Sequence, residues 1–102
     1  MNMNALNKMR PVHPGEVLRE EFLAPLGMTP HALAVRLRVT PSRINEIANE
    51  ERPVTLDTAV RFARFFNTTP EFWMSLQQTY DLKRIPKPLL REIERDIQPL
   101  TV

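Results

Sequence analysis

Residues 29–52 contain the signals for two short helices that begin in the same way and follow each other closely. Thr29 and Thr40 are each followed by proline. A threonine hydroxyl can accept a hydrogen bond from a free amide of the first helical turn, and proline suits the first helical position because no donor is needed there. Only a few residues remain to connect the two helices. They must therefore pack at a steep angle, as in a helix-turn-helix motif.

Each of these helices carries apolar residues on one face. At helical spacing the first helix has Leu33, Ala34 and Leu37, and the second has Ile44, Ile47 and Ala48. Val39 lies in the connection, and we expect it to fill the angle between the helices. This arrangement leaves the front of the second helix exposed.

The composition indicates an all-α fold. The chain has 102 residues, which suits one domain with a single modest core. It contains only two glycines, and this scarcity argues against a turn-rich β architecture. It has no cysteine, which excludes a disulfide framework and any site built on thiolates.

Charge and hydropathy predict a soluble, cytoplasmic protein with no membrane contact. The first residues, MNMNALNKMR, lack the apolar stretch of a secretion signal, and no run approaches the roughly 18 apolar residues of a membrane span. The formal net charge is only +2. A monomer would bind DNA weakly, because affinity grows with the number of phosphates that are neutralised. DNA binding would therefore nearly require a homodimer.

Helix signals divide the chain into three parts. Residues 1–12 show no periodicity and are predicted to be flexible, residues 13–84 form the helix-turn-helix domain, and residues 85–102 form a C-terminal amphipathic helix linked through prolines. Within the domain, a first helix is predicted from Pro14 or Gly15 to Ala24, stopped by Pro25 and Gly27. Thr55 is predicted to cap a further helix that ends at Asn67, and Thr69 with Pro70 opens the next one.

The buried faces of the two later helices are predicted from their apolar spacing. The first of them has an apolar stripe at Leu56, Ala59, Val60, Ala63 and Phe66. Phe62 and Phe65 fall off this stripe, so we expect one or both to be exposed in a dimer interface, the alternative being a wide buried face. The next helix is predicted to bury Phe72, part of Trp73, Leu76 and Tyr80, although these aromatic residues could instead form a patch for a partner.

The C-terminal segment carries an apolar stripe that must be buried somewhere. Its members are Leu89, Leu90, Ile93 and Ile97, and the opposite side is charged. Three alternatives remain open: the helix folds back on its own domain, pairs with a second copy, or meets a protein partner.

The exposed front of the second motif helix is the candidate DNA-reading site, formed by Thr40, Pro41, Ser42 and Arg43. In this geometry that end enters the major groove. Arg43 is the best candidate for reading guanine through O6 and N7, Ser42 suits either strand, and Glu46 can accept from cytosine N4. The alternatives are that Arg43 is a solvated charge or pairs with Glu46, and that Thr40 only caps its helix.

Residues flanking the motif are candidates for binding phosphates, which would position the protein without reading sequence; they are Arg36, Arg38, Asn49 and Arg52. Ordinary solvated charge is the alternative for each. His13 and His31 have no ligand spacing around them, so we predict no metal site, no cofactor and no catalytic residue.

Three stretches resemble a known family. Residues 13–29 read HPGEVLREEFLAPLGMT, residues 40–47 read TPSRINEI and residues 69–82 read TPEFWMSLQQTYDL. In content and order they are similar to the HigA/VapI family of bacterial antitoxins, within the phage-repressor-like helix-turn-helix superfamily, over residues 13–84. The resemblance implies a five-helix bundle like that of the lambda repressor, here with an additional C-terminal amphipathic helix. It also implies an antitoxin that neutralises a small basic RelE-like endoribonuclease toxin and, as a dimer on operator DNA, represses its own operon.

The chain departs from this family at two places. Arg38 stands where the superfamily usually has glycine, and a non-glycine residue in a left-handed turn costs about 1 kcal/mol. Glu50 and Glu51 stand where the family often has glycine and a basic residue, and two carboxylates there are expected to repel DNA. Two other functions therefore stay open: a repressor without a toxin, and a toxin-binding protein that has lost DNA binding.

Overall fold

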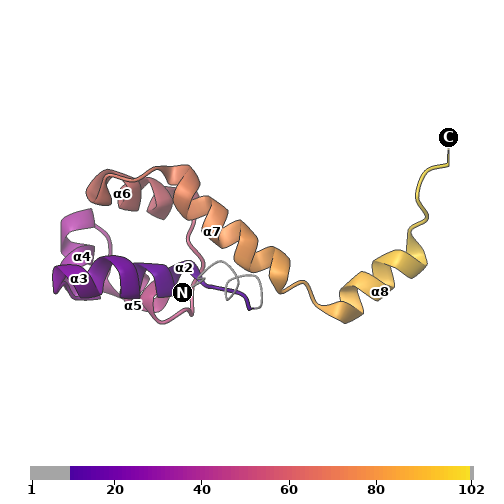
Figure 1. Cartoon of the computed structure of the whole chain (residues 1–102), viewed down its shortest axis with the longest axis horizontal. Coiled ribbons are helices and arrows are strands. Elements are labelled where there is room, and N and C mark those ends of the chain that lie inside the picture. Colours follow the sequence, from indigo (N-terminus) through magenta and orange to yellow (C-terminus); the bar gives the residue numbers. More distant parts are fainter. Residues whose placement is uncertain (1–9, 102) are drawn as a thin grey trace, which may run out of the picture.

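The computed structural model describes residues 10–101, and every element of regular structure in that range is a helix (Figure 1). Along the chain the elements are α2 (Pro14–Val17), η1 (Leu18–Leu23), α3 (Ala24–Leu26), α4 (Pro30–Leu37), α5 (Pro41–Ala48), α6 (Leu56–Phe66), α7 (Pro70–Lys83) and α8 (Lys87–Asp96). The predicted all-α fold is confirmed. Of the segment 1–12 that was predicted to be flexible, residues 1–9 lie outside the described residues.

The first helix is longer than predicted and contains a π-helical turn. It runs through α2, η1 and α3 as one continuous helix and ends at Gly27, which has a left-handed φ of 61°. Pro25 therefore lies inside the helix instead of stopping it. The amide of Ala24 donates to the carbonyl of Arg19, which is the wider spacing of a π-turn. This local widening gives the Pro25 ring room that a regular α-helix lacks.

The Thr–Pro pairs begin helices as predicted. The Oγ1 atoms of Thr29, Thr40 and Thr69 accept hydrogen bonds from the amides of Ala32, Arg43 and Phe72 at 3.1, 3.4 and 3.1 Å. Thr55 occupies the same position before α6, but its side chain makes no capping bond. Its hydroxyl lies 3.4 Å from that of Thr58 instead. Thr55 is therefore the N-cap residue of α6, as predicted, but the predicted capping hydrogen bond is not formed.

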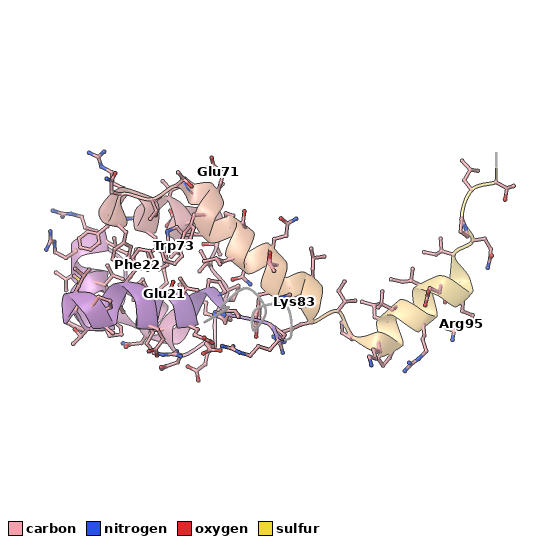
Figure 2. All side chains as sticks on the ribbon, viewed as in Figure 1. Glu21, Phe22, Glu71, Trp73, Lys83 and Arg95 are labelled. Carbon is pink, nitrogen blue, oxygen red and sulfur yellow. The ribbon has the colours of Figure 1, made fainter. Side chains whose placement is uncertain are left out.

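Trp73 lies at the centre of the core, where the first helix, α6 and α7 meet (Figure 2). It is wholly buried, and its ring centroid lies 4.8 Å from that of Phe62 and 5.1 Å from that of Phe22. Its Nε1 donates to the hydroxyl of Thr68 at 2.9 Å. The prediction that Trp73 is buried only in part was wrong, and Phe72, predicted to be buried, is 39% exposed. Trp73 is buried in preference to Phe72 because its larger ring fills the centre of the core and its one donor, Nε1, has a partner there.

The buried face of α6 is rotated relative to the predicted stripe. Leu56 and Val60 are exposed, by 63% and 48%, whereas Phe62 is completely buried. The prediction that Phe62 belongs to a dimer interface is therefore wrong. Phe65 is half-buried, with its ring 5.1 Å from that of Phe66. The reason is that Phe62 packs against Trp73, and this aromatic contact turns α6 so that Leu56 and Val60 face the solvent.

The N-terminus of α2 packs directly on the recognition-helix candidate α5. A Cβ placed on Gly15 would lie 1.7 Å from the carbonyl oxygen of Ile47, so the two backbones touch where only glycine fits. His13 lies beside this contact and caps α2, because its Nδ1 accepts from the amide of Gly15 at 2.8 Å. His13 is buried, and its ring meets the ring of Tyr80 edge-on with centroids 4.8 Å apart. These contacts join the start of the domain to α5 and α7.

Burial lowers the pKa of His13 below its ordinary value of 6.5, with Arg84 acting in the same direction and with Glu50, Asp81 and a backbone hydrogen bond to Arg52 opposing it. The folded protein thus holds the neutral imidazole, and the unfolded chain takes up the proton more readily. We expect the free energy of unfolding to fall as the pH drops below about 6.5. Urea denaturation at pH 7.5 and at pH 5.5 measures this loss.

The control for His13 is His13→Asn, which keeps an acceptor at the capping position but does not titrate in this range. Its free energy of unfolding is expected to change less between the two pH values than that of the parent. Equal changes in the two proteins would contradict the assignment of the effect to His13.

One buried side chain connects α7 to the loop that follows α5. Oε1 of Gln77 accepts from the amide of Val54 at 2.8 Å, and its Nε2 donates to Asp81 at 2.9 Å. Both Gln77 and Val54 are buried. This contact fixes the loop against α7, since an unpaired buried amide would be costly.

Helix α8 extends away from the bundle after the connection at residues 84–86 (Figure 1). All its residues are exposed, and its apolar side chains Leu89, Leu90 and Ile93 are 43%, 43% and 42% exposed. The alternative in which this helix folds back on its own domain is therefore wrong. The helix ends at Asp96, one residue before Ile97. Within residues 10–101, no helix is both long and apolar enough to cross a membrane.

Candidate nucleic-acid interface

The turn between α4 and α5 sets how the second helix is presented. Arg38 has a left-handed φ of 60°. The amide of Val39 donates to the carbonyl of Ala34 at 3.1 Å, which closes the end of α4. Val39 is half-buried beside the core, as predicted for a residue that fills the angle. The helix-turn-helix geometry predicted from the two Thr–Pro pairs is confirmed.

Replacing Arg38 with glycine is expected to stabilise the fold. Removing the left-handed strain gains about 1–2 kcal/mol, and the greater freedom of glycine in the unfolded chain offsets part of this. We expect the free energy of unfolding to rise by roughly 0.5–1 kcal/mol, measured by urea denaturation. Arg36→Gly is the control, since Arg36 lies inside α4 and the change there should destabilise by about 1 kcal/mol. A loss of stability in the Arg38 variant would contradict the strain argument.

The front of α5 is open to solvent. Thr40, Pro41 and Ser42 are exposed, and Ser42 Oγ donates to Thr40 Oγ1 at 3.3 Å. Asn45 and Asn49 continue this surface toward the end of the helix, and both are exposed. Asn45 was not predicted from the sequence. Its spacing of three from Ser42 was the available signal, and asparagine suits adenine N6 and N7.

Arg43 is held on the side of α5 that faces α6. Its Nη1 donates to Oδ1 of Asp57 at 2.9 Å and lies 3.5 Å from Oγ1 of Thr58. Its side chain is 31% exposed, so its guanidinium lies at the edge of the surface. The alternative pairing of Arg43 with Glu46 is not formed. Hydrogen bonds from Arg61, and then from Arg43, hold the pKa of Asp57 below its ordinary value.

Glu46 is paired with Arg52, the residue after the turn that follows α5. Nε of Arg52 donates to Oε1 of Glu46 at 2.8 Å. Both side chains are 41% exposed, so the pair lies at the surface and adds little stability. Within the described residues, the carboxylate of Glu46 and the guanidinium of Arg52 are thus already engaged with each other.

The other flanking residues are placed differently from one another. The guanidinium of Arg36 stacks on the ring of Phe65, with Cζ 5.0 Å from the centroid. Arg38 is exposed beside the tip of α5 and has no ion pair within residues 10–101. Asn49 occupies the C-cap of α5. Arg38 is therefore the flanking cation closest to the tip that is available to a phosphate.

The C-terminus of α5 is held by a residue that the sequence analysis did not select. Nη1 of Arg19 donates to the carbonyl of Ala48 at 2.6 Å, and its guanidinium lies 3.3 Å from Glu50. Glu50 has a left-handed φ of 64°, the conformation that favours glycine. Arg19 pairs with Glu50 and partly neutralises its charge, although the side chains of both Glu50 and Glu51 are exposed. In the described part of the chain, no group of three or more His, Cys, Asp or Glu side chains is arranged to hold a metal.

Known proteins share this arrangement. A helix-turn-helix family model (HTH_3) matches residues 18–73. The chain is 53% identical over 77 residues to virulence-associated protein I of Dichelobacter nodosus, covering 76% of this chain and 71% of that protein. It is 39% identical over 75 residues to antitoxin HigA-1 of Vibrio cholerae, covering 74% and 70%. The solved structure of Pseudomonas aeruginosa antitoxin HigA with the higBA promoter superposes with a TM-score of 0.83 at 42% identity, covering 90% of this chain and 100% of that one.

Proposed function

The chain belongs to the HigA/VapI family of helix-turn-helix antitoxins, and we propose that it represses its own operon by binding operator DNA through α5. The observation that carries this proposal is the exposed tip of α5, braced by α4 through the turn at Arg38. A tip of this kind enters the major groove while flanking residues contact the backbone.

Base reading is assigned to the front of α5. Arg43 reads guanine, Ser42 contacts either strand, and Asn45 reads adenine. Thr40 and Pro41 lie nearest the backbone, and Arg38, Arg36 and Asn49 bind phosphates. Glu46 and Arg52 contact DNA only if their ion pair at 2.8 Å opens. We therefore assign them a smaller contribution to DNA binding than the sequence alone indicated.

We assign homodimerisation to α8. Leu89, Leu90 and Ile93 are exposed on this helix, as is Ile97 just after it, and the helix lies away from its own bundle. A net charge of +2 makes one copy a weak DNA ligand, so two copies are needed to hold two half-sites. Because a twofold dimer uses the same patch on both copies, an exposed apolar helix suits this role.

The toxin partner is proposed from the family. It is a small basic RelE-like endoribonuclease, and the chain neutralises it by contact without catalysing a reaction itself. An antitoxin that meets both this enzyme and an operator acts in the cytoplasm. The toxin surface includes Phe65, which is half-buried on α6, or the part of α8 that a dimer leaves open.

A binding assay with duplexes tests the DNA function. We expect fluorescence anisotropy to show preferential binding to the duplex upstream of this gene over a shuffled duplex of the same composition. Arg43→Ala should weaken operator binding by roughly 10- to 100-fold, the worth of one bidentate guanine contact. Arg91→Ala on α8 removes the same charge far from α5 and is the matched control. Equal affinity of the parent for both duplexes would contradict DNA recognition.

The toxin function is tested separately. A tagged copy of the chain is co-expressed with the neighbouring open reading frame and purified. Retention of a small basic protein that cleaves RNA only after its release supports the antitoxin role. Operator binding without any retained partner would favour the alternative of a repressor without a toxin.

A further inference from the structure

The carboxylate of Asp57, in the first turn of α6, links α5 to the end of α4. Its Oδ1 accepts from Nη1 of Arg43 at 2.9 Å and from Nε of Arg61 at 2.8 Å. Arg61 in turn donates from Nη1 to the carbonyl of Leu37, the last residue of α4, at 2.7 Å. One carboxylate thus joins the arginine of the recognition helix to the helix that braces it.

This bond leaves one edge of the Arg43 guanidinium free. Within residues 10–101, only Nη1 of that side chain has partners, namely Asp57 and Thr58. Nε and Nη2 form the opposite edge, and two parallel donors on one edge are what guanine O6 and N7 accept. A guanidinium fixed through Nη1 therefore keeps a complete two-donor edge for a base.

We infer that Asp57 is a positioning residue for sequence recognition: it holds Arg43 so that its Nε and Nη2 edge faces a guanine. This inference rests on the proposed function. Free arginine side chains have many rotamers, and fixing one in the bound geometry reduces the ordering cost of binding. Asp57 acts through Arg43 and touches no base itself.

A purely structural ion pair would give a different result. Asp57 is exposed, and exposed pairs contribute little to stability. A carboxylate beside DNA also repels phosphates, so removing it should strengthen binding to every duplex if repulsion were its only effect. Positioning instead predicts weaker binding to the operator and unchanged or tighter binding to other DNA. The ratio of the two affinities separates the two cases.

The experiment compares the full-length parent with Asp57→Asn, Arg43→Ala and the double variant. Glu51→Gln is the matched control, because it removes an exposed carboxylate on the loop after α5. Dissociation constants are measured for the upstream duplex and for the shuffled duplex, and circular dichroism checks that each variant is folded. We expect Asp57→Asn to lower the operator-to-shuffled affinity ratio by about 10-fold and Glu51→Gln to leave it unchanged.

The double variant tests whether Asp57 acts through Arg43. In the Arg43→Ala background, Asp57→Asn should no longer change the ratio, because there is no guanidinium left to position. An unchanged ratio in the single Asp57 variant, or an equal fall in the Arg43→Ala background, would overturn the inference. A parent protein that does not prefer the upstream duplex overturns the proposed function itself.

Discussion

Replacing Gly15 with alanine is expected to lower the free energy of unfolding by about 3 kcal/mol or more. The added Cβ would lie 1.7 Å from the carbonyl oxygen of Ile47 and 2.8 Å from its carbonyl carbon. The obstacle is the backbone of α5, which cannot rotate away as the end of a flexible side chain could. To make room, α2 must separate from α5, and the added Cβ would also lie 3.0 Å from Nδ1 of His13, the atom that caps Gly15. Urea denaturation followed by far-ultraviolet circular dichroism measures the change.

Gly27→Ala is the internal control for this prediction. Gly27 has a left-handed φ of 61°, but a Cβ there would meet nothing within 4 Å. Its cost is therefore only the backbone term of about 1 kcal/mol. Equal destabilisation by the two substitutions would show that the contact between α2 and α5 is looser than described. A folded Gly15 variant should also bind the operator less tightly, because α5 loses its support.

Ending the chain after Arg84 is expected to separate the proposed dimer without unfolding the bundle. Helix α8 contributes nothing to the buried core, so the free energy of unfolding should change little. Sedimentation should show a monomer in place of a dimer. Affinity for an operator with two half-sites should fall by roughly 10²- to 10⁴-fold, the usual advantage of two linked binding units.

Two point variants distinguish the apolar face of α8 from its charged face. Ile93→Glu places a charge on the apolar stripe and should reproduce the effect of truncation on sedimentation. Arg91→Glu alters the helix to a similar degree elsewhere and should leave the dimer intact. A dimer that survives the loss of residues 85–102 would place the interface on the bundle and leave α8 for the toxin.

The starts of the helices were predictable because their causes are local. Thr29, Thr40 and Thr69 each need only the amide three residues further on, and that relation is visible in the sequence. The left-handed turn at Arg38 was expected from the family resemblance, because the superfamily usually has glycine at this place. Boundaries set by partners within one turn of helix therefore followed from the sequence.

The rotation of α6 and the burial of Trp73 were not predictable by the same means. Two faces of α6 carry apolar residues at helical spacing, and the choice between them depends on a ring in α7. Spacing within one helix contains no information about that partner. The π-turn before Pro25 similarly depends on how a continuous helix accommodates a proline, which a pattern of apolar residues does not record.

In the candidate site, too, residues within the motif could be predicted from the sequence, and residues that reach α5 from other helices could not. Ser42 and Arg43 were predicted because the motif itself presents the front of its second helix, and Ser42 is exposed there. Asp57 and Arg19 were missed because they reach α5 from other helices, through side chains distant in sequence. Gly15 was missed for a related reason: its importance is a contact between two backbones, and only a composition with two glycines hinted at it.

Gln77 has a consequence for how two bound copies would be spaced on DNA. It lies on α7 and accepts a hydrogen bond from the amide of Val54 in the loop after α5. The same helix, α7, leads into the connection to α8. In a dimer joined through α8, each reading tip would therefore keep its position relative to α7, and the connection at residues 84–86 would set the distance between the two tips. Such a protein would bind best to operators whose half-sites match that distance.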